Sequence, residues 1–179
     1  MAAPADGIRN VRYAQLDSVD RLSHPLLRRL HDEWLAAIPA GLPGYDFIDP
    51  HRLRYLLGYL LVIGVVRGVQ DSMRFHYRLI GSDLVARVGR DVTGLWMDEH
   101  PDPEVARDGP PACRLAAETG QPVHITAQRV IFDKRYPLEY LLLPLANAGG
   151  SIDRLLIAQL YPPDAPRLPY GGGSPQEVA

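Results

Sequence analysis

Cysteine is nearly absent from this sequence: Cys113 is the single one among 179 residues. One cysteine excludes an intramolecular disulfide and a zinc site built from clustered cysteines. The sequence also lacks an unbroken apolar run of the roughly 18 residues that cross a membrane. Its longest apolar stretch, Leu56–Val66, is interrupted by Gly58, Tyr59 and Gly64. The first residues do not show the basic segment and apolar run of a secretory signal, so we expect a cytoplasmic protein.

A strong charge of either sign is missing as well. The formal net charge is -2 and the isoelectric point is near 6.3. No basic field is therefore present to hold a phosphate backbone, and we do not expect a nucleic-acid partner. Phosphate loops, nucleophile elbows and metal-ligand triads are also missing, which disfavours the common enzyme classes. The hydrophobic fraction of 46% is that of an ordinary folded domain.

Residues outside a central region form three predicted segments. Residues 1–20 are predicted to be a flexible N-terminus, because the first ten are small, polar or Gly/Pro-marked. Residues 21–59 are predicted to be a helical extension, with Ser23 as a cap and Pro25 in the first turn. One face of this helix is apolar and carries Leu26, Leu27, Leu30, Trp34, Leu35 and Ile38. Residues 162–179, rich in Pro and Gly, are predicted to be a disordered tail.

The central region, residues 60–161, is predicted to be one domain of strands and short helices. Runs of β-formers predict strands over 61–66, 73–80, 123–132, 136–145 and 152–161. A short helix is expected after Gly81 and another over 102–119, which Gly109-Pro110-Pro111 should break or restart. Two hairpin blocks separated by helices predict an α+β fold, with an antiparallel sheet and helices on one face.

Four short motifs carry a resemblance to a known family. The more specific two are Phe75–Ser82 (FHYRLIGS) and Gly89–Gly94 (GRDVTG); the weaker two are Thr119–Pro122 (TGQP) and Leu143–Leu145 (LPL). Together with the order of elements, they make the chain resemble the PAS domain, in particular short stand-alone PAS-like proteins of proteobacteria. The resemblance implies a five-stranded antiparallel sheet of order 2-1-5-4-3, with an N-terminal extension that packs on its open face or mediates dimers.

The resemblance implies a role in signalling rather than a chemistry. PAS domains bind small molecules between sheet and helices, or pair with other domains, and pass a signal on. We see no output domain, so we expect a protein partner to carry the output and the chain to form a homodimer. A sensor with a ligand cavity and a ligand-free dimerisation or adaptor module both remain open. A small α+β isomerase or dehydratase using His100 with Asp98 and Glu99 is the third, least favoured interpretation.

Side chains on the later strands and the helices are candidates for a ligand cavity. Aromatic rings facing the helices from the second strand could line such a cavity, or could fill the core. His124 alternates with Thr126 and Gln128 on a face that reaches a pocket, meets solvent, or lies under the N-terminal helix. The candidate ligand-binding residues are Phe75, Tyr77, Leu79, Trp96, Cys113, His124 and Tyr140.

The two glycine-bearing motifs are interpreted as structural. Their glycines would serve backbone turns. Arg78 and Arg90 would form ion pairs with Asp83 or Asp91 that hold the loop, a role that we favour over contact with a ligand. The structural candidates are Arg78, Gly81, Ser82, Gly89, Arg90, Asp91 and Gly94.

Two cofactors of PAS domains can be tested against the sequence. Flavin-binding members carry Asn-Cys-Arg-Phe-Leu, whereas Ala112–Leu115 reads ACRL, lacks the Asn and the Phe, and comes late in the chain. Haem-binding members place a histidine on the long helix before the third strand, and residues 102–119 contain none. The sequence therefore argues against flavin and haem, and the nature of any ligand stays open.

Overall fold

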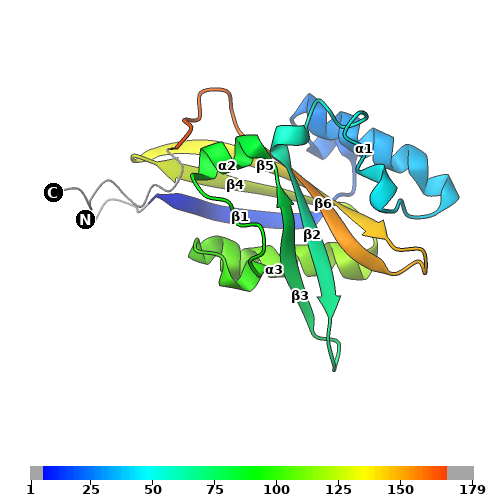
Figure 1. The fold of residues 1–179 in the computed structure, drawn as a ribbon. Helices are drawn as coiled ribbons and strands as arrows, with labels where there is room; N and C mark the ends of the chain where they lie inside the picture. Colours follow the sequence, from blue (N-terminus) through cyan, green and yellow to red (C-terminus); the bar gives the residue numbers. More distant parts are fainter. Residues whose placement is uncertain (1–5, 169–179) are drawn as a thin grey trace.

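A computed structural model describes residues 6–168, in which six strands form one antiparallel sheet (Figure 1). The strands are β1 (Gly7–Gln15), β2 (Leu60–Arg67), β3 (Met73–Ile80), β4 (Val123–Ile131), β5 (Lys134–Ala146) and β6 (Ile152–Leu160). Their order in the sheet is β1-β4-β5-β6-β2-β3. Without β1, this is the order implied by the resemblance, so the predicted α+β class and five-stranded arrangement are confirmed. β1 adds a sixth strand beside β4.

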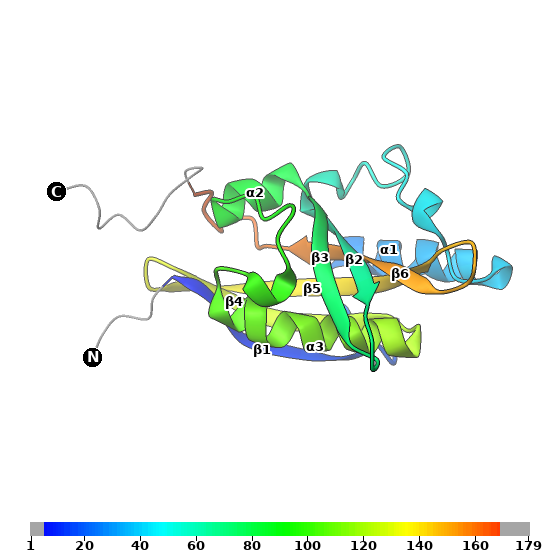
Figure 2. The ribbon, with the colours of Figure 1, turned by 60° about the horizontal axis from the view of Figure 1, so that its bottom comes forward.

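Three α-helices and several single turns lie around the sheet. The helices are α1 (Pro25–Ala37), α2 (Ser82–Val88) and α3 (Pro103–Thr119). Short 3-10 turns occupy Val19–Arg21, Ile38–Ala40, Tyr45–Phe47, Leu57–Tyr59 and Met97–Glu99. Figure 2 shows α3 in front of the sheet and α1 behind it. The N-terminal extension therefore covers the face that α2 and α3 leave open.

The prediction of a flexible N-terminus over residues 1–20 is wrong for its described part. Gly7–Gln15 pairs with β4 along most of its length, with a register shift between Arg9 and Arg12. The segment is polar because β1 is an edge strand, and within it only Gly7 and Ile8 are buried. Backbone pairing with β4 outweighs its weak strand signal. Residues 1–5 lie outside the described residues.

The prediction of a disordered tail over residues 162–179 is also wrong where the structure describes it. Ala165 is buried, and the Leu168 N–H donates to the Ala86 carbonyl oxygen at 2.7 Å. Arg167 forms an ion pair with Asp83 of α2. Residues up to 168 thus pack against α2, while residues 169–179 lie outside the described part of the chain.

Each face of the sheet carries its own apolar core. On one face α3 packs through small side chains, Ala112, Cys113, Ala116 and Ala117, which let the helix approach the strands closely. On the other face α1 buries Leu27, Leu30 and Trp34 against leucines of β5 and β6. The apolar stripe of α1 is narrower than predicted, because Leu35 is 52% exposed.

Helix α3 runs unbroken through Pro110 and Pro111, contrary to the predicted break. Each proline removes one hydrogen bond to a carbonyl four residues earlier, at Ala106 and Arg107. Arg107 is exposed, so water can bind its carbonyl oxygen. The next turn is buried against the sheet, and this packing offsets the missing bonds.

Gly81 links the sheet to α2 through a close backbone approach. Its N–H donates to the Leu60 carbonyl oxygen at 2.8 Å, and a Cβ added there would lie 2.4 Å from the Gly58 carbonyl oxygen. We expect Gly81→Ala to lower the free energy of unfolding by about 2 kcal/mol, because backbone must move. Urea denaturation measures this against Ser82→Ala, which removes no capping bond and should stay within about 0.5 kcal/mol. Equal stability of the two variants would contradict the close approach.

Candidate functional site

A cavity lies between the sheet and the helices α2 and α3. About 100 Å³ of it is open to the centre of a water molecule. Most of its wall is apolar, with Leu61, Ile80, Val92, Met97, Ile125 and Ile157 among the lining residues. Polar side chains also line it: Tyr77, His100, Asp102, Arg129, Tyr140 and Gln159. An apolar cavity with a few convergent polar groups is the usual form of a small-molecule site.

Asp102 organises one part of the cavity wall. It caps α3, because its Oδ1 accepts from the Glu104 N–H at 3.1 Å. Its Oδ2 accepts from the Ile8 N–H at 2.5 Å, which ties β1 to the start of α3. The Arg129 guanidinium lies 3.9 Å from the same oxygen. Both carboxylate oxygens are thus engaged by protein donors.

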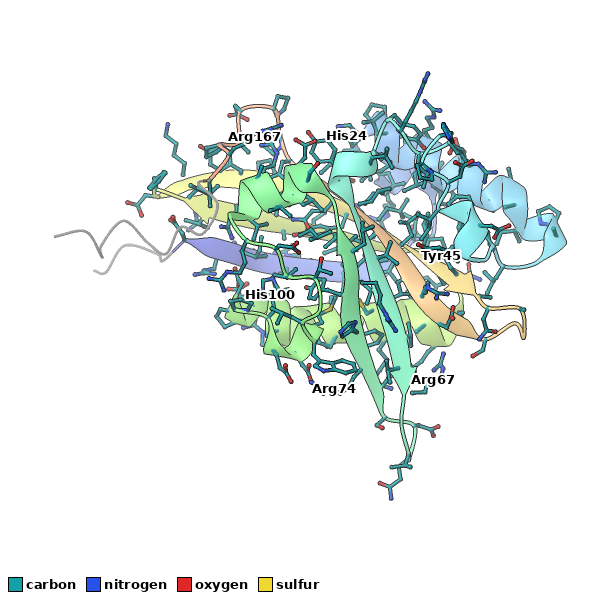
Figure 3. The ribbon with its side chains drawn as sticks, in the orientation of Figure 1. His24, Tyr45, Arg67, Arg74, His100 and Arg167 are labelled. Carbon is teal, nitrogen blue, oxygen red and sulfur yellow. The ribbon has the colours of Figure 1, made fainter. Side chains whose placement is uncertain are left out.

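His100 stands beside the start of α3 (Figure 3) and is held neutral. Its Nδ1 accepts a hydrogen bond from the Asp102 N–H at 2.9 Å, which leaves the proton of the neutral ring on Nε2. Burial lowers the pKa of His100 and outweighs the nearby Asp102 carboxylate, which favours the charged form. The His100 ring also packs against Tyr77, with ring centroids 5.8 Å apart.

Three of the predicted ligand-binding residues meet at this cavity. Tyr77, Cys113 and Tyr140 all line it, although they come from β3, α3 and β5. The Cys113 thiol points to the Met97 sulfur at 3.7 Å, and burial raises its pKa well above the usual range. Phe75 is buried in the same core but lies outside the lining, so it fills the core. The role of these side chains in ligand binding stays a prediction.

Leu79 does not face the helices, because a β-bulge shifts the alternation of β3. Tyr77 pairs with Ile63 and Leu79 with Val62, so Arg78 is an extra residue in β3. After the bulge Leu79 turns outward and is 45% exposed. Ile80 takes the cavity-facing place instead.

Trp96 also lies outside the cavity, on the outer side of β3. Its ring meets His76 edge to face at 5.0 Å between centroids, and the Arg74 guanidinium lies 4.3 Å above it. Arg74 in turn binds Asp98 at 2.7 Å and Glu99 at 2.8 Å. Figure 3 shows Arg74 at the lower rim, apart from His100. Asp98 and Glu99 therefore pair with Arg74, whereas His100 lines the cavity.

His124 lies on the opposite face, under the start of α1. Its Nε2 is 2.9 Å from Oε1 of Glu139. The same Oε1 accepts from the Ser23 N–H, and Oε2 accepts from the His24 N–H. Of the three placements that the sequence left open for His124, the N-terminal extension covers it. Ser23 consequently binds Glu139, and the His24 ring caps α1 in its place.

The predicted ion pairs of Arg78 and Arg90 do not form within residues 6–168. Arg78 extends over Gly64, where an added Cβ would lie 2.8 Å from its Nε. Asp83 binds Arg167, and Asp91 accepts from the Thr93 N–H at 2.8 Å in a local turn.

The glycines of these motifs serve turns. Gly89 ends α2 in the left-handed region at φ 76°, and Gly94 follows at φ 90°. Side chains that carry a Cβ rarely adopt such φ values.

Sequence reasoning missed Arg129, Asp102 and Gln159 as cavity residues. Arg129 had a usable signal: it shares its strand face with Val123, Ile125 and Ala127, which are all buried. A charged residue in register with an apolar strand face is rare unless it has a partner. Asp102 and Gln159 had no comparable signal, because a helix cap and a buried glutamine look ordinary in sequence.

Known proteins are similar to this chain in two of three comparisons. The family model of the PAS domain matches residues 22–158. A search of curated proteins finds no match. Among solved structures, the chain is similar to an RNA-binding Light-Oxygen-Voltage receptor, at 16% identity and a TM-score of 0.45. That alignment covers 88% of this chain and 40% of the receptor chain.

Two further observations bear on the class of protein. No helix within residues 6–168 is long and apolar enough to cross a membrane. In the same part of the chain, no group of three His, Cys, Asp or Glu side chains is placed to hold a metal ion. The family model spans well over half of the sequence, including most of the cavity lining and most of the extension. This chain belongs to the PAS domain family.

Proposed function

We propose that this PAS domain is a sensor that binds a small organic molecule in the cavity and signals through a partner protein. PAS domains are general sensory and signalling modules, and most have no enzymatic activity. The observation that carries the proposal is the cavity itself, apolar in most of its wall but also lined by the Tyr77 and Tyr140 hydroxyls and the Arg129 guanidinium, which make no hydrogen bond within residues 6–168. The absence of catalysis, the cytoplasmic location, the homodimer and the partner stay predictions.

The tyrosine hydroxyls of the cavity support a bound molecule. Within residues 6–168, neither the Tyr77 nor the Tyr140 hydroxyl makes a hydrogen bond. Burial raises the pKa of both, so both are neutral donors at physiological pH. Neither hydroxyl is among the fully buried atoms that lack a partner, so both are open to the cavity that they line. A ligand that accepts hydrogen bonds could use both hydroxyls as donors.

The size of the cavity favours a compact ligand. Pockets for drug-sized molecules have volumes of about 300–1,000 Å³, whereas this cavity has about 100 Å³. This comparison supports a molecule much smaller than flavin or haem, in agreement with the motifs that argue against both. The adaptor alternative has less support, because α1 buries its apolar stripe on its own sheet.

A pair of substitutions at Val105 tests the proposal. Val105 lines the cavity and is half-buried, so a larger side chain there can fill the cavity without rebuilding the core. We expect a panel of small acids, alcohols and amides to contain compounds that raise the melting temperature of the wild type. Val105→Trp should abolish these shifts, and the matched Val105→Ala should keep them.

Native mass spectrometry of the purified protein gives an independent reading. We expect a bound mass on the wild type that is missing from Val105→Trp. A bare-chain mass, together with no melting shift for any compound, would refute the sensor proposal. The adaptor alternative would then predict that deletion of the residues before Asp49 changes the oligomeric state.

A further inference from the structure

Arg129 is a buried arginine without a hydrogen-bond acceptor. Its residue is 8% exposed, it lines the cavity, and its Nε is fully buried and unpartnered. Within residues 6–168 none of its N–H groups makes a hydrogen bond. A buried charge is costly unless it is paired and hydrogen-bonded. The five N–H donors of this guanidinium therefore require a hydrogen-bond acceptor that the described residues do not supply.

Asp102 does not meet this need. It is 3.9 Å from the Arg129 guanidinium, beyond hydrogen-bond distance. Its oxygens already accept from the Ile8 and Glu104 N–H groups, and Arg9 lies 4.0 Å away on the other side. Because Asp102 holds β1 and the start of α3 in place, it is not free to turn toward Arg129.

Two further donors line the cavity together with Arg129. They come from His100 and Tyr140, and the neutral amide of Gln159 lines the same cavity. His100 presents an N–H at Nε2, since its Nδ1 is occupied. The Tyr140 hydroxyl has no acceptor in the described chain. The cavity therefore offers a cation and neutral donors beside the neutral amide of Gln159, and the carboxylate of Asp102 in its lining already accepts from two backbone N–H groups.

We infer that the ligand is a small organic acid whose carboxylate is bound by Arg129 and the Tyr140 hydroxyl. Its apolar body lies against Val92, Met97 and Ile157. This inference rests on the proposed function of the cavity as a ligand site. A planar guanidinium matches a carboxylate through two parallel N–H bonds. A phosphate would bring a second charge and further oxygens, which the apolar wall cannot satisfy.

Matched pairs of acid and alcohol test the inference. The probes are butyrate, hexanoate and benzoate, each compared with the alcohol of the same carbon skeleton, by calorimetric titration near neutral pH. We expect the wild type to bind its best acid at least about tenfold more tightly than the matched alcohol. Arg129→Met should weaken acid binding about ten- to a hundredfold, the range of a charge-assisted hydrogen bond, and leave alcohol binding unchanged.

Further variants separate charge from geometry. Arg129→Lys keeps the charge without the planar fork, so we expect part of the acid preference to remain. Tyr140→Phe keeps the charge and loses one donor, so it should weaken acid binding a few-fold. Arg135→Met removes an exposed arginine that does not line the cavity, and it should bind like the wild type. Retained alcohol binding shows that each variant is folded. If Arg129→Met does not fold, the inference is tested by Arg129→Lys and by the preference of the wild type for acid over alcohol.

The failures of the two proposals can be told apart. Equal binding of acid and alcohol by the wild type overturns the inference and leaves the cavity as a ligand site. A bound mass that proves to be a base or a neutral compound also overturns the inference alone. Binding of neither probe class, together with a bare-chain mass, overturns the proposed function and the inference together.

Discussion

Replacing Trp34 by alanine should lower the free energy of unfolding by about 3–5 kcal/mol. Trp34 is the largest side chain that α1 buries, and only 3% of it is exposed. Its Nε1 donates to the Pro144 carbonyl oxygen of β5 at 3.1 Å, so the substitution also leaves a buried acceptor unpaired. Urea denaturation followed by circular dichroism measures the loss.

Two control variants show how much of this loss comes from the hydrogen bond and from the burial of the Trp34 ring. Trp34→Phe keeps an aromatic ring but removes the donor, and should cost about 1–3 kcal/mol. Leu35→Ala changes the neighbouring, exposed residue of the same helix and should stay within about 0.5 kcal/mol. If Trp34→Ala were as mild as Leu35→Ala, the docking of α1 on the sheet would be wrong.

Glu139→Ala should lower the free energy of unfolding by about 2–4 kcal/mol, because it leaves several donors unpaired. The carboxylate accepts from the Ser23 N–H at 2.8 Å, the Ser23 hydroxyl at 2.7 Å and the His24 N–H at 2.9 Å. His124 adds a contact at 2.9 Å. Glu139 therefore joins the N-terminal extension to the sheet, and its loss should free the start of α1. Faster amide hydrogen exchange at Ser23 and His24 would locate the effect.

The contribution of Glu139 to the free energy of unfolding should also depend on pH. Burial alone raises the pKa of Glu139, but hydrogen bonds from Ser23, His24 and His124 together hold it below its ordinary 4.5. A group whose pKa is lower in the folded than in the unfolded state stabilises the fold fully at pH values above its unfolded-state pKa. This stabilisation is lost as the pH falls through its folded-state pKa. The stability gap between wild type and Glu139→Gln should therefore shrink below about pH 4.5.

Unfolding in urea between about pH 7 and pH 3 measures this gap. Glu118→Gln is the matched control, since Glu118 is exposed and forms only a surface pair with Arg114. Its effect should be small at every pH. A Glu139 gap that persists unchanged to the acid end of the range would show that the carboxylate is not held by these bonds.

Local patterns were sufficient to predict most of the central domain. Met73–Ile80 has the predicted bounds, the helix Ser82–Val88 follows Gly81 as expected, and the other central strands differ by a few residues at most. Strand alternation and capping residues encode these elements within a few neighbouring positions. One of the cavity residues, Tyr77, was predicted in the same way, because alternation places it on the face toward the helices.

Features that depend on distant contacts were not predicted. β1 forms because β4 presents a free edge, although its own residues favour no structure. The bulge at Arg78 reverses the direction of Leu79, since one unpaired residue shifts every later side chain to the other face. The two prolines of α3 remain helical because the helix packs on the sheet.

The sequence by itself determined that this chain forms an α+β domain, because strand periodicity, caps and turn glycines are local properties, and its short motifs carried the resemblance to the PAS domain. Only the tertiary structure decided what lines the cavity. Arg129, Asp102 and Tyr140 come from β4, the start of α3 and β5, and a local pattern does not record that they meet. Whether a buried charge has a hydrogen-bond acceptor depends on atoms far apart in the chain. The Arg129 guanidinium, with Asp102 at 3.9 Å but no acceptor within hydrogen-bond distance in the described residues, therefore became visible only in the folded molecule.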